Sequence, residues 1–378
     1  MKILLTGGGT GGHIIPLLAV VSEIRKMEIE KGLAESEFMF IGPRGDFNQS
    51  ILDAGIKVKI IQAGKLRRYF SLANFTDIFK IMIGTIQSLF FVNQFKPDVV
   101  FSKGGFASVP PVIAAWVYKT PIITHESDII PGLANRIIAR FAKKILISFY
   151  SSKKYFSEKK VILSGNPIRE DILQGDKNRA REFFGLKENM PTILVFGGSQ
   201  GARKINNVVI KALPKILEKF QVIHLCGKGD YEKLKSEMEK LEIDNKSRYR
   251  IYPFLSDELK DAFALYDVII SRAGASSLFE IVALEKPGII IPLASAANNH
   301  QVENAEFFQE RKMLIVIKED VLDENVLTEK IFELFEENQL RKNMSAEMKK
   351  YNNFIGQKPV YNIISEIFDF DKGVNVKK

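Results

Sequence analysis

The sequence predicts an α/β protein built from two doubly wound, Rossmann-like domains that face each other across a cleft. An apolar run from Ile3 to Thr6 leads into the glycine-rich turn Gly7–Gly12. The same pattern returns where Ile193–Phe196 leads into Gly197–Ala202, at an offset of 193 minus 3, or 190 positions, close to half of the 378 residues. A chance match of two glycine-rich loops is the alternative, but the apolar tetrads match as well. A strand, a glycine turn and a helix therefore open each half of the chain.

The composition favours a cytoplasmic protein with an anionic partner. The net charge is +9, and Cys226 is the single cysteine, so no disulfide framework or cysteine metal cluster is expected. No nucleic-acid-binding motif is present, so nucleic acid is not expected as a partner. Phosphorylated substrates and anionic lipid remain as candidate partners. The apolar run after Lys2 ends at Thr6, too early for a signal peptide. No cofactor and no bound metal are expected.

The first half alternates between strand and helix patterns. The first helix is expected from about His13 to Lys31, with Pro16 in its first turn, so that free N–H groups and the positive helix end face a phosphate on the glycine turn. The rival dinucleotide fingerprint lacks the acidic residue that should end the second strand, because Gly42 and Pro43 stand there. The strands of this half are expected at 3–6, 38–41, 58–61, 97–102, 121–125, 145–148 and 161–163.

The segment between Gly64 and Lys96 combines basic residues with a broad apolar helix face. One interpretation is a core-facing helix behind a basic loop. The other is that this apolar face and the basic residues beside it rest on an anionic membrane surface. The apolar stretch is expected to be too short and too polar to span a bilayer. The candidate membrane-contact residues are Lys65, Arg67, Arg68, Phe75, Phe79, Met82 and Trp116.

The ends of the predicted strands carry the polar residues. Lys103–Phe106 follows one strand, and His125, Glu126 and Asp128 follow the next. In an open parallel sheet this edge binds ligands. The second half repeats the alternation, with strands near 192, 222, 249, 268, 288 and 314. The expected domains are 1–164, 165–350 beginning with a hinge at 165–169, and a C-terminal helix in 351–378 that could pack back on the first domain.

Two groups of residues are candidates for catalysis and for substrate binding. His13 follows the first glycine turn and is the candidate general base, which Glu126 or Asp128 could orient or replace. His224 lies in an apolar strand and is expected to be a satisfied core residue. Glu280 follows a glycine-containing loop, and its two carboxylate oxygens suit a ribose diol. Together with the loop at Gly197, it indicates a site for a nucleotide diphosphate sugar in the second half. Zinc-protease, serine-hydrolase and Walker motifs are absent.

Seven motifs that occur in order along nearly the whole chain resemble the MurG family of peripheral N-acetylglucosaminyltransferases. They are GGGTGGHIIP from Gly7, KGGFASVPP from Lys103, HESDIIPGLANR from His125, GNPIR from Gly165, GGSQGA from Gly197, SRAGASSLFE from Ser271 and NNHQVENA from Asn298. The resemblance implies a GT-B fold and an inverting transfer of GlcNAc from UDP-GlcNAc to the C4 hydroxyl of MurNAc-pentapeptide on undecaprenyl-pyrophosphate. This step converts lipid I to lipid II in peptidoglycan synthesis. It also implies a peripheral location on the cytoplasmic face of the membrane, with proteins of cell-wall synthesis and division as possible partners.

The resemblance also assigns site residues. His13 and Glu126 would be catalytic, and Arg169 and Ser199 would contact the diphosphate. The other donor-site residues would be Thr10, Gly11, Gly12, Asp128, Leu255, Ala275, Ser276, Glu280 and Gln301. Two positions depart from the family pattern.

Asp128 stands where many relatives have Asn, so it can accept a hydrogen bond from a sugar hydroxyl but cannot donate one as an amide does. Phe106 stands where others have Tyr, so no hydroxyl is available there. A UDP-GlcNAc 2-epimerase of the same architecture and a non-catalytic sugar-nucleotide sensor are the alternatives.

Overall fold

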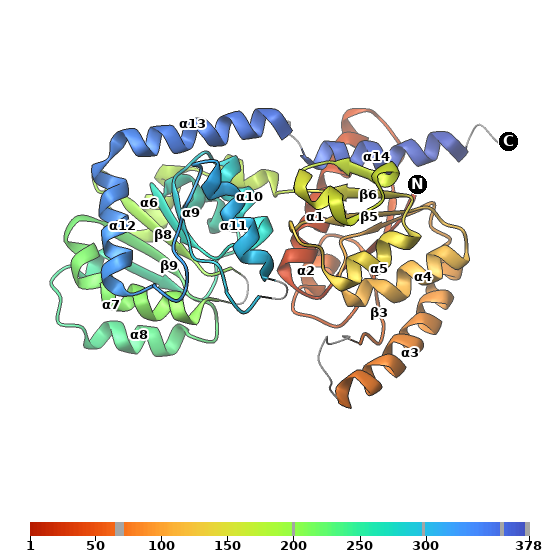
Figure 1. The fold of residues 1–378 in the computed structure, drawn as a ribbon, viewed down its shortest axis with the longest axis horizontal. Helices are drawn as coiled ribbons and strands as arrows, with labels where there is room; N and C mark the ends of the chain where they lie inside the picture. Colours follow the sequence, from red (N-terminus) through yellow and green to blue (C-terminus); the bar gives the residue numbers. More distant parts are fainter. Residues whose placement is uncertain (65–71, 199–200, 297–298, 356–358, 375–378) are drawn as a thin grey trace. The chain divides into compact units, whose positions relative to one another are not determined.

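The computed structural model describes the chain except for residues 65–71, 199–200, 297–298, 356–358 and 375–378. The chain divides into two compact units, which Figure 1 shows in the colours of the sequence. The first unit consists of Met1–Ile168 and Gln357–Lys378, and the second of Arg169–Gly356. The boundaries lie a few residues beyond those expected from the sequence. Each unit is described by itself below.

The first unit is built on a parallel sheet. In the described residues it has seven strands in the order β3-β2-β1-β4-β5-β6-β7. Its strands are β1 (Lys2–Thr6), β2 (Glu37–Gly42), β3 (Lys57–Ile60), β4 (Val99–Ser102), β5 (Ile122–Glu126), β6 (Lys144–Ile147) and β7 (Val161–Leu163). Its helices are α1 (Gly11–Glu30), α2 (Asn48–Asp53), α3 (Leu72–Phe95), α4 (Val109–Val117), α5 (Leu133–Phe141) and α14 (Pro359–Val374).

The apolar strand runs explain this sheet. Ile3, Leu4 and Leu5 of β1 are buried, and they divide between two apolar clusters, one on each face of the sheet. A strand covered on both faces has a continuous apolar sequence rather than an alternating one. The predicted strand positions of the first half are confirmed.

The end of the chain belongs to the core of the first unit. Helix α14 packs against α1, and its buried side chains join the cluster around β1. These side chains are Val360, Ile363, Ile364 and Ile367. The last helix therefore supplies apolar cover that the first 168 residues do not provide themselves.

The second unit repeats the architecture. Its described part has a six-stranded parallel sheet in the order β10-β9-β8-β11-β12-β13. The strands are β8 (Thr192–Phe196), β9 (Gln221–Leu225), β10 (Tyr249–Tyr252), β11 (Val268–Ser271), β12 (Gly288–Ile290) and β13 (Ile315–Val316). The helices are α6 (Lys177–Phe184), α7 (Arg203–Lys219), α8 (Tyr231–Lys240), α9 (Glu258–Leu265), α10 (Ala275–Ala283), α11 (His300–Glu310), α12 (Glu324–Glu336) and α13 (Asn338–Ile355). The expected strands of the second half are confirmed.

Candidate active site

The strand order of the first sheet changes direction between β1 and β4, and ligands of open parallel sheets bind beside such a point. The loops that follow these two strands touch there. The amide of Gly8 donates a hydrogen bond to the carbonyl of Gly104 at 3.1 Å. The two glycine-rich loops predicted from the sequence therefore lie side by side at the edge where a ligand is expected.

Glycine is required where these loops enclose the His13 ring. A Cβ atom on Gly8 would lie 2.8 Å from His13 Nδ1, and one on Gly105, whose φ is +86°, would lie 3.2 Å from His13 Nε2. Either side chain would push the imidazole away. A Cβ on Gly12, by contrast, would meet no atom within 4 Å, so the fold itself leaves space at that position.

His13 lies in the first turn of α1, which begins at Gly11 rather than near His13. Pro16 therefore falls beyond the first turn, where its missing N–H removes one helix hydrogen bond. The His13 Nδ1 atom lies 2.9 Å from Thr10 Oγ1. Burial and the nearby Lys103 charge lower the pKa of His13 to about 4, against an opposing effect of Asp128. The imidazole is therefore neutral at pH 7 and able to accept a proton.

Glu126 ends β5 and is only 3% exposed. Its Oε1 atom accepts a hydrogen bond from the Asp128 amide at 2.9 Å, and its Oε2 atom accepts one from Asn135 Nδ2 at 2.7 Å. The Gly105 amide donates to Asn135 Oδ1 at 3.3 Å, which connects this carboxylate to the loop beside His13. Burial, and next the Asp128 charge, raise the pKa of Glu126 to about 7.

Lys103 is a member of this site that sequence reasoning did not select. It is 3% exposed, and its Nζ atom donates hydrogen bonds to His125 Nδ1 at 2.6 Å, to Asn166 Oδ1 at 3.2 Å and to Ser127 Oγ. His125 Nε2 lies 2.9 Å from the Gly165 carbonyl, to which it must donate, so Nδ1 is the accepting nitrogen. The available signal was the position of Lys103, directly after a buried strand and before two glycines.

In the second unit, Arg169 and Glu280 meet. Arg169 Nε lies 3.3 Å from Glu280 Oε1, and Glu280 is buried in α10. Burial raises the pKa of Glu280, while the Arg169 charge opposes that shift. Ala275 and Ser276 open the same helix after the loop that follows β11. The predicted diphosphate and ribose residues are therefore neighbours.

The remaining donor-site candidates follow other strands of the second sheet. Leu255 lies half-buried in the loop between β10 and α9, and Gln301 lies in the first turn of α11. Gln301 Oε1 accepts a hydrogen bond from the Leu293 amide at 3.0 Å. Its amide nitrogen is the end that a sugar hydroxyl could meet. Ser199 lies outside the described residues.

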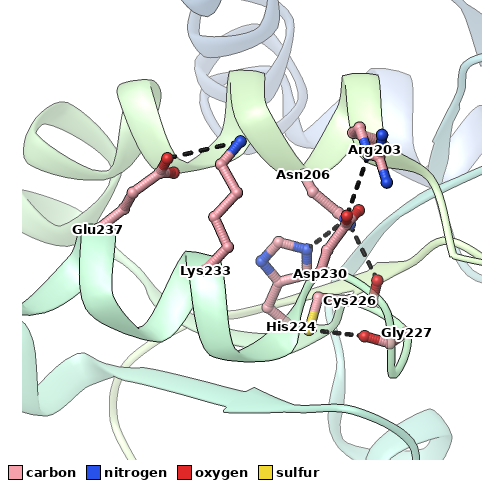
Figure 2. A network of polar contacts seen from close by, with 8 residues as sticks. All are labelled: Arg203, Asn206, His224, Cys226, Gly227, Asp230, Lys233 and Glu237. Atoms are coloured by element: carbon pink, nitrogen blue, oxygen red, sulfur yellow. Dashed lines mark hydrogen bonds and ion pairs between the residues drawn. The ribbon is translucent and has the colours of Figure 1, made fainter.

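A polar network surrounds the first turns of α7, as Figure 2 shows. His224 Nε2 donates to Asn206 Oδ1 at 2.9 Å, and Asn206 Nδ2 donates to the Cys226 carbonyl and to Asp230 Oδ2, each at 2.9 Å. Arg203 Nε also lies 3.1 Å from Asp230 Oδ1. Burial lowers the pKa of His224 to about 3. The prediction of a satisfied core histidine is confirmed, and the network joins the start of α7 to the loop after β9.

The membrane-contact candidates lie on α3 and α4, which pack together (Figure 1). Lys65, Arg67 and Arg68 lie outside the described residues, and so does the side chain of Phe75. Phe79, Met82 and Trp116 are exposed. Sequence reasoning did not select Ile86 and Phe90 for this role, although they are the most exposed large apolar side chains in the described part of α3, at 67% and 65%. Their helical spacing was the available signal.

The expectation that this helix is too short and too polar to span a bilayer does not hold by length and composition, because α3 is longer than the apolar run indicated. Within the described residues, Thr76–Phe95 is a single helical stretch that has the length and composition to cross a membrane, with 22% of it buried in the protein. Core helices of soluble proteins can have the same length and composition. On its inner side, Ser88, Val92 and Phe95 are buried, so part of α3 is bound into the first unit.

Comparisons with known proteins place the chain in a family. The models for the N-terminal and C-terminal domains of glycosyltransferase family 28 match residues 3–147 and 192–364. A Clostridium perfringens protein named UDP-N-acetylglucosamine–N-acetylmuramyl-(pentapeptide) pyrophosphoryl-undecaprenol N-acetylglucosamine transferase is 41% identical over 98% of both chains. The chain belongs to the MurG family. A Bacillus cereus protein with the same name, numbered 2, is 38% identical over 97% of this chain and 99% of its own.

Solved structures agree with the MurG family assignment. Acinetobacter baumannii MurG matches with a TM-score of 0.67 and 25% identity, over 92% of this chain and 94% of that one. A Neisseria meningitidis UDP-GlcNAc 2-epimerase matches with a TM-score of 0.66 over 97% and 99% of the chains, but at 16% identity this likeness shows the fold alone. The predicted fold class is confirmed.

The sites fall into two groups. The first unit brings together Thr10, His13, Glu126 and Asp128, and the second brings Arg169 beside Glu280. Among the described residues, His, Cys, Asp and Glu side chains form no group of three or more that could hold a metal ion.

Proposed function

We infer that the chain transfers N-acetylglucosamine from UDP-GlcNAc to the C4 hydroxyl of MurNAc-pentapeptide on undecaprenyl-pyrophosphate, converting lipid I to lipid II with inversion at the transferred sugar. The observation that carries this conclusion is the 41% identity, over 98% of both chains, to a relative named for this reaction. Both halves of the family 28 glycosyltransferase architecture are present as well.

We propose that the second unit binds the donor. Glu280 would hold the ribose diol through its carboxylate oxygens, and Arg169 would meet the charge of the diphosphate as UDP departs. Their 3.3 Å contact supports this proposal because it places a cation beside the carboxylate that would bind the ribose. Ser199, Leu255, Ala275, Ser276 and Gln301 are proposed as further donor contacts.

We propose His13 as the base that removes the acceptor proton while the sugar C1 develops oxocarbenium character. In the tautomer with Nδ1–H donating to Thr10 Oγ1, Nε2 carries the free lone pair. The neutral state of the ring at pH 7 supports this role. Glu126 is less suited, because both of its oxygens accept hydrogen bonds from the protein. We propose that it organises the site, with Asp128 as an acceptor for a sugar hydroxyl beside Thr10, Gly11 and Gly12.

We further propose that the protein binds the cytoplasmic face of the membrane peripherally through α3 and the end of α4. The exposed apolar side chains Phe79, Met82, Ile86 and Phe90, with Trp116, support this proposal. An undecaprenyl-linked acceptor would be presented at that surface. The basic residues Lys65, Arg67 and Arg68 precede the helix in the sequence and would meet anionic headgroups.

The experiment that tests the function measures UDP release from UDP-GlcNAc with and without a lipid I analogue. A transferase releases UDP at a substantial rate only when the acceptor is present. An epimerase would instead form the 2-epimer of the sugar nucleotide without acceptor, and a sensor would bind UDP-GlcNAc without turnover. Either of those results would overturn the proposal.

A further inference from the structure

The side chain of Lys103 joins the ends of several strands of the first sheet. Lys103 follows β4, His125 and Ser127 lie at the end of β5, and Asn166 follows β7. Each of the three N–H bonds of an ammonium group has an acceptor here: His125 Nδ1, Ser127 Oγ and Asn166 Oδ1. The ammonium is therefore engaged by the protein rather than directed to a ligand.

Packing alone does not call for a lysine in this position. Removing an ammonium group from water is costly, and a well-packed apolar side chain of similar volume is often as stable or more stable in a buried site. Methionine would fill much of the same space. An ionisable amine that is only 3% exposed therefore indicates a role in the site rather than in the core.

The groups around Lys103 are those of the candidate active site. His13 of α1, His125 and Glu126 of β5, and Asp128 in the following loop interact electrostatically with it. Lys103 also donates a hydrogen bond to Oγ of Ser127, the residue between Glu126 and Asp128, and so holds this segment in place. Removing the Lys103 amine would therefore displace the segment that carries both carboxylates, or change the protonation of these carboxyl groups.

We propose that Lys103 is a positioning residue for glycosyl transfer, whose ammonium fixes the Glu126–Asp128 segment beside the loop that holds His13. This inference rests on the proposed function. Misplacing catalytic groups by about 1 Å can cost on the order of 10²-fold in rate. Burial lowers the pKa of Lys103 to about 7, against the opposing charges of Glu126 and Asp128. In its charged form Lys103 lowers the pKa of Glu126 and of His13, so its removal raises both.

The test compares Lys103→Met, Lys103→Gln and Lys286→Met with the wild-type protein. Lys286 is a matched control in the second unit. It is partly buried, desolvation lowers its pKa to about 7, and it donates to the carbonyls of Phe263, Ala264 and Tyr266. The measurements are kcat against pH with a lipid I analogue, the Kd for UDP-GlcNAc and the melting temperature.

For Lys103→Met we expect kcat to fall on the order of 10²-fold and the acid limb of the pH profile to move to higher pH. The Kd for UDP-GlcNAc should rise much less than kcat falls, because the proposed nucleotide contacts lie in the second unit. Lys103→Gln should lose less kcat, since its amide still donates hydrogen bonds, but should shift the acid limb similarly. Lys286→Met should keep the wild-type profile.

A wild-type acid limb in both Lys103 variants would overturn the proposal, as would a kcat loss no larger than that of Lys286→Met at the same loss of melting temperature. If Lys103→Met fails to fold, the kcat and the acid limb of Lys103→Gln test the proposal. Failure of the proposed function is a separate result, because the wild-type protein would then show no transfer.

Discussion

Burial shifts the pKa values of His13 and Glu126 in opposite directions, because it disfavours the charged form of each group. Burial and the Lys103 charge lower the pKa of His13, whereas burial and the Asp128 charge raise that of Glu126. The two groups therefore change protonation state in well-separated pH ranges. Substitution and pH dependence can distinguish their roles.

His13→Ala should reduce kcat by about 10² to 10⁴-fold, the range that general base catalysis contributes. The Kd for UDP-GlcNAc should change little, because the proposed nucleotide contacts lie in the second unit. Steady-state kinetics and calorimetry measure the two quantities. Wild-type turnover, or equal losses in turnover and donor affinity, would remove His13 as the base.

The acid limb of the wild-type kcat profile should have its midpoint near pH 7, where Glu126 takes up a proton. Below this pH the carboxyl group is neutral and no longer a charged acceptor for the Asp128 amide and Asn135, so activity falls. Glu126→Gln should have low activity and lack this limb. A profile that falls only near pH 4, in the range of His13, would show that Glu126 need not be ionised.

At the scale of the element, α3 has one side in the core of the first unit and the other exposed. Ser88, Val92 and Phe95 are buried, whereas Met82, Ile86 and Phe90 are more than half exposed. Substituting the exposed side chains should therefore change surface binding without changing stability.

The double substitution Ile86→Ser and Phe90→Ser should weaken binding to phosphatidylglycerol vesicles at least about tenfold. Burying one large apolar side chain contributes about 1.5–3 kcal/mol, and about 1.4 kcal/mol corresponds to a factor of ten. Vesicle co-sedimentation measures the effect. Ile29→Ser, at an exposed apolar position of α1, is the control that should bind as the wild type does. Equal binding by all three proteins would contradict a role for α3.

For α14 we expect the opposite result, namely that substitution of a buried side chain lowers the stability of the first unit. Ile363→Ala should lower the free energy of unfolding by about 2–5 kcal/mol, because it leaves a cavity in the cluster around β1. The urea midpoint of the first unit measures this loss. Ile86→Ala, which truncates the same residue type at an exposed position, should leave the midpoint nearly unchanged. An unaltered midpoint in Ile363→Ala would show that α14 does not stabilise the unit.

At the scale of the whole molecule, local patterns predicted the two sheets and several residues of the candidate site. The apolar runs bounded by glycine and proline located the strands, since fully buried parallel strands need continuous apolar sequences. The glycine turn before His13, the strand that ends at Glu126 and the loop before the helix of Glu280 indicated these three candidate residues. These features depend on neighbours in the sequence or on the shared edge of a parallel sheet.

Features that depend on side-chain contacts between distant strands were not predictable in this way. A lysine after a strand is usually solvated, and the burial of Lys103 follows only when His125 and Asn166 are placed around it. The choice between Glu126 as a base and Glu126 as an organiser likewise required Asn135 and the Asp128 amide. Ile86 and Phe90 looked equally suited to a core-facing helix until α3 was placed in the fold.

The most direct test of the central claim is the fate of the radiolabel when the purified protein is incubated with UDP-GlcNAc labelled in the sugar and a lipid I analogue. We expect the label to move to the lipid in proportion to the UDP released, and to stay on the nucleotide when the acceptor is omitted. Label recovered as the 2-epimer, as free sugar, or only as intact UDP-GlcNAc in the presence of acceptor would contradict the assignment as an N-acetylglucosaminyltransferase.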